Sequence, residues 1–203
     1  MSRPTAPAVA RNRDAILHVL RIEFAERQRV LEIGSGTGEH GVHFAAAMPW
    51  LVWQLSDRRD NHAGIEAWVE HAKLDNLSGP LELDVDAPPE FTVGFDAVFS
   101  ANTAHIMSEN QVRATVRLVG RTLPEGGRFA LYGPFKVDGS FTSDSNARFD
   151  ASLRAQQPHM GIRELEDLDQ WCRDAGLLRR SLYAMPANNF VVVWQRSESG
   201  SNS

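Results

Sequence analysis

Short apolar runs alternate along the chain with longer segments in which apolar residues recur every three or four positions. A continuous apolar run is typical of a strand buried on both faces, whereas a period near 3.6 is typical of an amphipathic helix. The predicted strands are 29–33, 51–55, 81–85, 95–99 and 128–132, and the predicted helices are 11–26, 39–48, 61–74, 109–123 and 164–175. This alternation indicates a parallel sheet with helices on both faces.

The last part of the chain departs from this alternation. After Gly176, the strand-like segments 179–184 and 190–194 are separated only by the short break 185–189. Two strands joined by a short turn form an antiparallel hairpin. We therefore expect an α/β, Rossmann-like fold whose seven-stranded, mostly parallel sheet ends in a C-terminal antiparallel hairpin. The connection 135–161 is longer than a plain loop, and such insertions are often functional.

The length of 203 residues fits one domain. We expect a flexible lead-in at 1–8, which is rich in Pro and Ala, a single domain at 9–196, and a disordered polar tail at 197–203.

Composition and charge favour a small-molecule ligand over a polyanion. The formal net charge is −5, and no block of Lys or Arg stands out. A nucleic-acid or membrane partner held by phosphate charge would need a basic stripe, so we expect neither. Cys172 is the only cysteine, and no apolar run approaches the roughly 20 residues that span a bilayer. We expect a cytoplasmic protein that is a monomer or a homodimer.

The first predicted strand ends in a glycine-rich loop, Glu32-Ile33-Gly34-Ser35-Gly36-Thr37-Gly38. Glycines let a backbone turn tightly and approach a ligand closely, and the helix that follows points free N–H groups at that ligand. The spacing G-x-G-x-G differs from the G-x-G-x-x-G of nicotinamide enzymes. An acid at Glu32 suits the cationic sulfonium and amino group of S-adenosylmethionine (SAM). We expect Glu32, Gly34, Ser35, Gly36, Thr37 and Gly38 to bind SAM.

Two acids follow the next predicted strands. Asp57 lies about 20 residues past the loop, where an acid binds ribose hydroxyls, although a helix N-cap is the alternative role. Asp84 is placed to accept from the adenine amino group, and Val85 to pack against the ring. Asp86 is a nearby competitor for Asp84.

Polar residues after the later strands are expected to face the transferred methyl group and its acceptor, because ligands lie at the carboxyl ends of the strands in open α/β sheets. Asn102 is expected against the cofactor, and His105 and Tyr132 are candidate catalytic residues. His105 is either a general base or a positioning residue. The amides of Asn146, Asn188 and Asn189 are candidates for substrate binding, with turn formation as the alternative.

No metal site is expected. His40 and His43 lie three residues apart, but the metalloprotease pattern H-E-x-x-H is absent and no third ligand is evident.

Taken together, these residues resemble the class I SAM-dependent methyltransferases, and more narrowly the methyltransferase-like family known as domain of unknown function 938. The resemblance covers about Ala10 to Trp194. Its most specific parts are Arg11-Asn12-Arg13, the segment Leu31 to His40, the segment Ser100 to Ile106, Tyr132-Gly133-Pro134-Phe135, Ser145-Asn146 with Phe149-Asp150, and Met185-Pro186-Ala187-Asn188-Asn189. Thr103 departs from the pattern, in which a larger apolar residue is expected.

The resemblance implies the fold and SAM as cofactor, but no particular substrate. It also implies that the helix before the first strand covers the cofactor cleft. Arg11, Asn12 and Arg13 then become candidates for substrate binding, with Arg11 or Arg13 pairing with a carboxylate on SAM or on the acceptor, and a surface salt bridge is the alternative role of the two arginines. The functional hypothesis is methyl transfer from SAM to a small molecule, with S-adenosyl-L-homocysteine (SAH) as product. The alternatives are a SAM-binding module without catalysis and, less favoured, a nicotinamide-dependent oxidoreductase.

Overall fold

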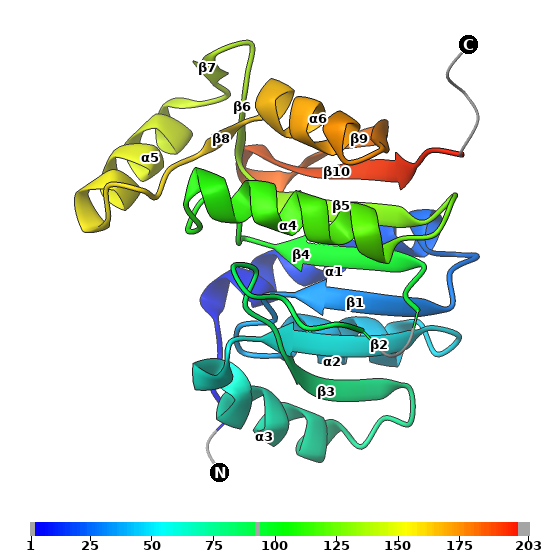
Figure 1. The fold of residues 1–203 in the computed structure, drawn as a ribbon. Helices are drawn as coiled ribbons and strands as arrows, with labels where there is room; N and C mark the ends of the chain where they lie inside the picture. Colours follow the sequence, from blue (N-terminus) through cyan, green and yellow to red (C-terminus); the bar gives the residue numbers. More distant parts are fainter. Residues whose placement is uncertain (1–2, 92–93, 199–203) are drawn as a thin grey trace.

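A twisted seven-stranded sheet forms the centre of the computed structural model, which describes residues 3–91 and 94–198 (Figure 1). The strand order is β3-β2-β1-β4-β5-β10-β9. The first five strands pair in parallel, and β10 pairs antiparallel with both β5 and β9. The bounds are β1 (Arg29–Ile33), β2 (Val52–Asp57), β3 (Leu77–Glu82), β4 (Ala97–Ala101), β5 (Arg128–Gly133), β9 (Leu177–Met185) and β10 (Asn189–Arg196). The predicted sheet and terminal hairpin are confirmed.

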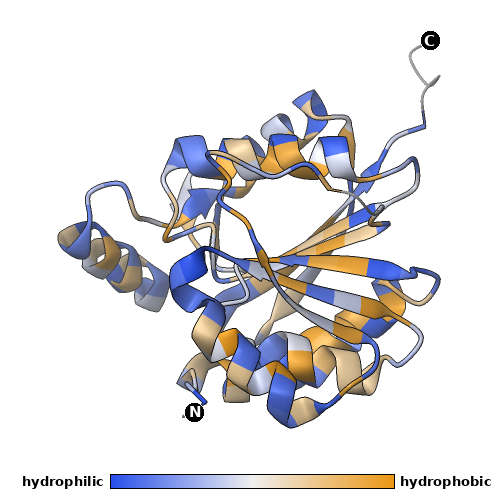
Figure 2. Ribbon diagram, turned by 60° about the horizontal axis from the view of Figure 1, so that its bottom comes forward, coloured by the Kyte–Doolittle hydropathy of each residue, from blue (hydrophilic) through white to orange (hydrophobic). Residues whose placement is uncertain are grey.

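Helices cover both faces of this sheet because each strand carries apolar side chains to both sides. On one face lie α1 (Pro7–Glu23), α2 (Glu39–Ala47) and α3 (His62–Ala72), and on the other lie α4 (Glu109–Thr122) and α6 (Leu165–Asp174). Figure 2 shows hydrophobic residues concentrated along the strands and polar residues on the outer helix surfaces. Aromatic rings fill the core of the first face, where Phe44 packs 5.4 Å from Trp53 and 5.4 Å from Phe99 between ring centroids.

The third strand lies earlier in the chain than predicted. We expected it at 81–85, but β3 spans Leu77–Glu82, so Asp84 and Val85 follow the strand rather than end it. The strand lies at the edge of the sheet and contains Pro80, which is tolerated there because an edge strand leaves one row of N–H groups unpaired. Half-exposed edge strands do not form a continuous apolar run, which explains the misplaced prediction.

The first helix begins four residues earlier than predicted. Pro7 occupies its first turn, where a missing N–H costs nothing, so part of the expected lead-in is helical. The backbone N–H of Ala6 donates to Glu39 Oε2 at 2.6 Å, which fastens the start of α1 to the start of α2. The expected tail lies mostly outside the described residues, which end at position 198.

The insertion after β5 contains a small sheet and a helix. Strands β6 (Phe135–Val137), β7 (Ser140–Phe141) and β8 (Arg163–Glu164) pair in the order β7-β6-β8, and α5 (Asp144–Gln156) lies between β7 and β8 in the chain. In Figure 1, α5 projects beyond the carboxyl ends of the parallel strands. Two 3-10 turns complete the fold, η1 (Arg59–Asn61) before α3 and η2 (Pro186–Asn188) in the hairpin.

Candidate functional site

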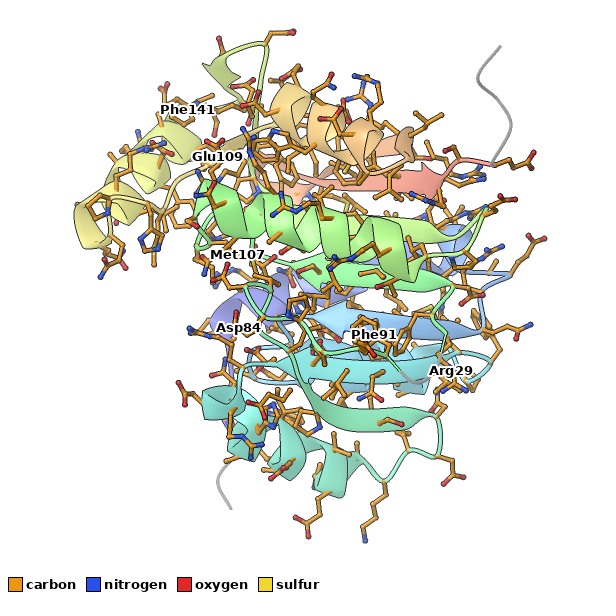
Figure 3. All side chains as sticks on the ribbon, viewed as in Figure 1. Arg29, Asp84, Phe91, Met107, Glu109 and Phe141 are labelled. Carbon is orange, nitrogen blue, oxygen red and sulfur yellow. The ribbon has the colours of Figure 1, made fainter. Side chains whose placement is uncertain are left out.

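A cavity of about 1860 Å³ opens at the carboxyl ends of the parallel strands. In Figure 3, Asp84 and Met107 lie at this end of the sheet and Arg29 at the opposite end. The order in which successive strands are added reverses between β1 and β4, because β2 and β3 lie on one side of β1 while β4 and β5 lie on the other. Ligands of open α/β sheets bind at this switch point.

The glycine loop follows β1 and forms one wall of the cavity. Gly34 and Gly36 have φ angles of +73° and +58°, which L side chains adopt only with strain. The N–H groups of Gly34 and Ser35 donate to the carbonyl of Ser56 at 3.1 and 3.0 Å, so the loop is tied to the end of β2. A Cβ on Gly34 would lie 2.6 Å from Thr103 Cγ2, whereas a Cβ on Gly36 would meet nothing within 4 Å.

Asp57 ends β2 and holds the loop from the other side. Its Oδ2 accepts from Gly36 N at 2.7 Å, and its Oδ1 accepts from Arg58 N at 2.7 Å and Asn61 Nδ2 at 2.9 Å. A carboxylate has about four acceptor sites, so one site on Oδ2 remains for a ligand. Asp57 lines the cavity, as predicted from its spacing to the loop.

Asp84, Val85 and Asp86 line the same part of the cavity. Asp84 Oδ1 accepts from Asp86 N at 3.0 Å, which leaves Oδ2 without a hydrogen bond among the described residues. Asp86 Oδ2 accepts from Gln111 Nε2 at 2.9 Å. Because Asp86 already has a side-chain partner, Asp84 is the better placed of the two acids to accept from a ligand.

Glu32 and Gly38 do not line the cavity. The Glu32 side chain is 1% exposed, and its Oε2 accepts from Trp53 Nε1 at 2.6 Å beneath the loop. Burial raises the pKa of this carboxyl to about 8, against the lowering effect of the hydrogen bond from Trp53. Gly38 precedes α2 and packs against Ile65. Both residues lie outside the cavity lining and support the loop from below, so cofactor contact by Glu32 and Gly38 stays a prediction.

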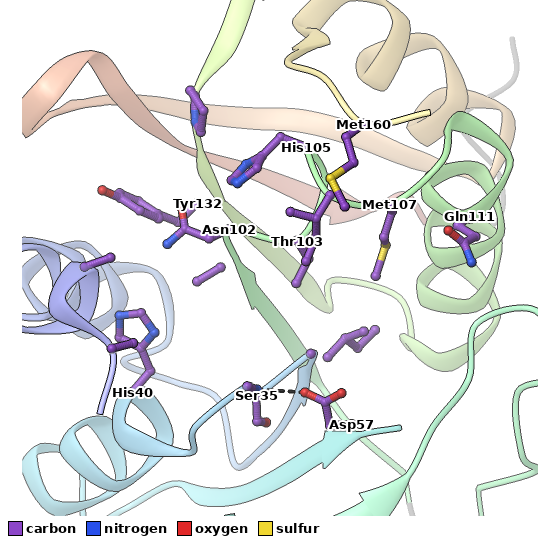
Figure 4. Close-up of a pocket in the computed structure, with 18 of the residues that line it drawn as sticks. Ser35, His40, Asp57, Asn102, Thr103, His105, Met107, Gln111, Tyr132 and Met160 are labelled. Carbon is purple, nitrogen blue, oxygen red and sulfur yellow. Dashed lines mark hydrogen bonds between the residues drawn. The ribbon is translucent and has the colours of Figure 1, made fainter. Parts of the chain in front are cut away.

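Asn102 follows β4 in a left-handed conformation, with φ +59°. Its N–H donates to the carbonyl of Tyr132 at 2.9 Å, but its side-chain amide has no hydrogen bond among the described residues. Figure 4 shows Asn102 and Tyr132 on the same side of the cavity. A strained residue with a free amide is typical of a ligand-binding position. The neighbouring Thr103 is buried and bonds Ser100 through its hydroxyl at 2.7 Å.

Asn12 and His40 bring α1 and α2 to the cavity. His40 Nε2 and Asn12 Oδ1 lie 2.8 Å apart, and both residues are buried. Burial lowers the pKa of His40 to about 4, helped by the charges of His43 and Arg13, so the ring is neutral and donates from Nε2. The pKa of Tyr132 is raised by burial, against a hydrogen bond with Asn12 and the charge of Arg11, so its hydroxyl stays protonated. From the sequence, His40 was part of the segment that carries the family resemblance and a metal ligand judged improbable, and no role at the cavity was assigned to it.

His105 lies across the cavity from His40 (Figure 4). It is 7% exposed and packs edge-on against Phe149, with 5.2 Å between ring centroids. Burial, and after it the charge of Arg163, lower the pKa of His105 to about 4. A neutral imidazole of low basicity is suited to hydrogen bonding rather than to holding a proton.

The remaining predicted substrate residues divide into two groups. Arg11, Asn146 and Asn189 line the cavity, whereas Arg13 and Asn188 do not. Asn146 Nδ2 donates to the carbonyl of Asn188 at 3.0 Å, so the α5 segment is fastened to the hairpin turn. Asn189 Nδ2 donates to the carbonyl of Pro186 at 3.2 Å, which is turn chemistry beside the cavity.

The insertion also supplies cavity residues. Phe149 of α5 and Met160, which follows α5, line the cavity, and Pro134 lines it just before the insertion. Phe149 and Pro134 belong to the segments that carry the family resemblance, whereas nothing in the sequence pattern signalled Met160, since an isolated apolar residue in a loop carries no periodicity.

Within residues 3–91 and 94–198, no group of three or more His, Cys, Asp or Glu side chains is arranged to hold a metal ion. No helix in this part of the chain is both long and apolar enough to cross a membrane.

This sheet order, with a glycine loop after β1 and an acid at the end of β2, is the fold of the class I SAM-dependent methyltransferases. The chain belongs to the family described as protein of unknown function DUF938, whose model matches residues 3–196.

Solved structures show the same fold. The SAM-dependent methyltransferase SibL is 23% identical with a TM-score of 0.80, and the alignment covers 94% of this chain and 56% of SibL. A putative O-methyltransferase from Nostoc punctiforme is 16% identical with a TM-score of 0.80, covering 93% of this chain and 57% of the other. PigF, solved with SAH, is 17% identical with a TM-score of 0.74, covering 85% and 51%. The chain thus spans little more than half the length of these proteins.

Proposed function

We propose that the protein is a SAM-dependent methyltransferase that acts on a small molecule by direct displacement. The observation that carries the proposal is the cavity itself: the glycine loop, the Asp57 carboxylate and the pair Asp84–Val85 meet around one space at the switch point of the sheet.

The residues present fit SAM. A Cβ on Gly36 would point into open space, so the backbone there is accessible to a ligand. Asp57 retains one acceptor site for a ribose hydroxyl, and Asp84 Oδ2 is free for an adenine amino group, while buried Val85 offers an apolar surface for the ring. The three acids that line the cavity, Asp57, Asp84 and Asp86, lie in this half, which we call the cofactor half.

The opposite side of the cavity is the acceptor half, defined by Arg11, Asn12, His105, Tyr132, Asn146 and Phe149. SAM supplies a methyl group on a positively charged sulfur, and transfer to a nucleophile leaves a neutral thioether. The protein's own task is then alignment, which contributes up to about 7–11 kcal/mol to lowering a barrier. The Tyr132 hydroxyl and the free Asn102 amide are placed to orient the acceptor, and α1 covers the cleft.

Binding and turnover test this proposal separately. Calorimetry with SAM, SAH and NAD measures the cofactor preference, and we expect SAM and SAH to bind and NAD not to. If NAD binds and SAM does not, the protein is an oxidoreductase and the proposal fails.

Turnover distinguishes an enzyme from a SAM-binding module. A metabolite extract incubated with methyl-labelled SAM should yield a labelled small molecule with wild-type protein and none with Asp57→Ala. Tight SAM binding without a labelled product across diverse extracts would favour the non-catalytic module.

A further inference from the structure

The charges around the acceptor half point to the class of molecule that enters it. Each carboxylate among the described cavity-lining residues belongs to the cofactor half, which also holds Arg58 beside Asp57. The acceptor half is lined instead by the guanidinium of Arg11, by amides and by the hydroxyl of Tyr132. A cationic substrate would need a carboxylate, whereas a guanidinium among donors, with no carboxylate, complements an anion.

Two more arginines lie behind this wall. Arg163 donates through its guanidinium to the carbonyls of Ala104, Met107 and His159 and forms no ion pair with a described residue. Arg13, the residue after Asn12 in α1, likewise forms no ion pair among the described residues, and its Nε is buried without a hydrogen-bond partner there. Carbonyl oxygens satisfy hydrogen bonds but do not cancel a charge, so the charge of Arg163 is opposed only by the nearby carboxylates of Glu109 and Asp150, with which it forms no ion pair.

The titratable groups of the acceptor half respond to these charges. After burial, the pKa of His105 is lowered by Arg163, and that of His40 by His43 and Arg13. The charge of Arg11 opposes the burial that raises the pKa of Tyr132. Three separate arginines therefore act on three groups that surround the same space.

The walls farther out are apolar. Phe149 and Met160 from the α5 segment line the cavity together with Pro134 and Ile106, and Phe149 is 40% exposed. Such residues pack against a hydrocarbon or aromatic body, so the charged group of a ligand is left to Arg11, Asn12 and Tyr132.

From this charge distribution we propose that the methyl acceptor is a small organic anion with an apolar body, whose negative group is bound at Arg11 beside Asn12 and Tyr132. The inference rests on the proposed function, since it describes the second substrate of that site. Carboxylates and phosphate esters share the required chemistry.

A matched pair of probes that differ in charge tests the inference. Benzoate and benzamide have nearly the same shape, and their dissociation constants are measured by calorimetry on full-length protein saturated with SAH. We expect benzoate to bind at least about tenfold more tightly, because a hydrogen bond to a charged group contributes about this much. Phenyl phosphate is the third probe, and whether it or benzoate binds more tightly identifies the anion as phosphate ester or carboxylate.

Arg11→Gln is the informative variant, and Arg117→Gln on the exposed side of α4 is its matched control. We expect Arg11→Gln to reduce the preference for benzoate to less than about threefold with SAH affinity unchanged, and Arg117→Gln to leave both unchanged. Equal binding of benzoate and benzamide, or an unchanged preference in Arg11→Gln, overturns the inference.

Binding of SAH distinguishes a failure of the inference from a failure of the proposed function. If SAH displaces benzoate competitively, Arg11 serves the carboxylate of the cofactor and the inference is refuted, although the proposed function stands. If SAH does not bind at all, the proposed function fails, and the ratio of benzoate to benzamide affinity in the ligand-free protein still measures the charge preference.

Discussion

Replacing Gly34 by alanine should destabilise the protein more than the same change at Gly36. Both glycines have positive φ, +73° and +58°, so both substitutions carry the strain of a left-handed conformation. They differ in space: a Cβ on Gly34 would lie 2.6 Å from Thr103 Cγ2, and a Cβ on Gly36 would meet nothing within 4 Å.

The expected magnitudes follow from these two terms. Left-handed strain costs about 1–2 kcal/mol at either position, and overpacking adds about 1–3 kcal/mol at Gly34 alone. Gly34→Ala should therefore lose roughly 2–5 kcal/mol of unfolding free energy, and Gly36→Ala roughly 1–2 kcal/mol. Thr103→Ser removes Cγ2 but keeps the hydroxyl that bonds Ser100, so in combination with Gly34→Ala it should recover the overpacking term.

Urea unfolding of the wild type and the three variants measures these differences, and SAM calorimetry is expected to rank the two glycine variants by a different property, their effect on binding. Gly36→Ala should weaken SAM binding more than it weakens the fold, because its methyl group enters the cavity. Equal losses of stability for the two alanine variants, or no recovery with Thr103→Ser, would refute the packing argument.

Three further predictions concern ionisable groups. Because the pKa of Glu32 is raised to about 8 in the folded state from 4.5, the fold binds the extra proton, so its stability should fall as pH rises from about 4.5 to 8. Glu32→Gln should remove this decline in urea unfolding at pH 5 and pH 8. The imidazole of His105, whose pKa is lowered to about 4, should show no NMR titration between pH 6 and 8. Asp57→Ala should weaken SAM binding about tenfold or more, since it removes the carboxylate that holds Gly36 N and offers a ribose acceptor.

The matched control for Asp57→Ala is Asp60→Ala on the exposed η1 turn, which should leave SAM affinity unchanged. A pH-independent wild type, a His105 titration near 6.5, or equal SAM affinity in both aspartate variants would contradict the respective reasoning.

Elements buried on both faces were the easiest to predict. The strands β1 and β5 begin at the predicted residues, because every side chain in them is apolar or packed. The edge strand β3 was misplaced, since one side of it faces solvent and Pro80 interrupts its pattern. Apolar runs in a sequence reflect buried side chains, and an edge strand has too few buried side chains to produce such a run.

The candidate site was predicted where residues lie at strand ends. Asp57, Asn102, His105 and Tyr132 all line the cavity, as their places after β2, β4 and β5 indicated. Glu32 does not, although it is adjacent in sequence to the loop, because its buried side chain turns toward Trp53 on the neighbouring strand β2. Which side of a strand a polar residue takes depends on partners from other strands, and the sequence does not state them.

The sequence by itself determined the alternation of strands and helices, the glycine loop and its distance to Asp57, because these depend on local periodicity and backbone conformation. Only the tertiary structure decided what surrounds the substrate. Asn12, His40, His105 and Phe149 come from segments as far apart as α1 and α5, and packing alone brings them to one cavity. The placement of Asp57, Asp84 and Asp86 in the cofactor half and of Arg11 in the acceptor half is likewise a property of the folded chain, since these residues come from separate elements that meet only at the cavity.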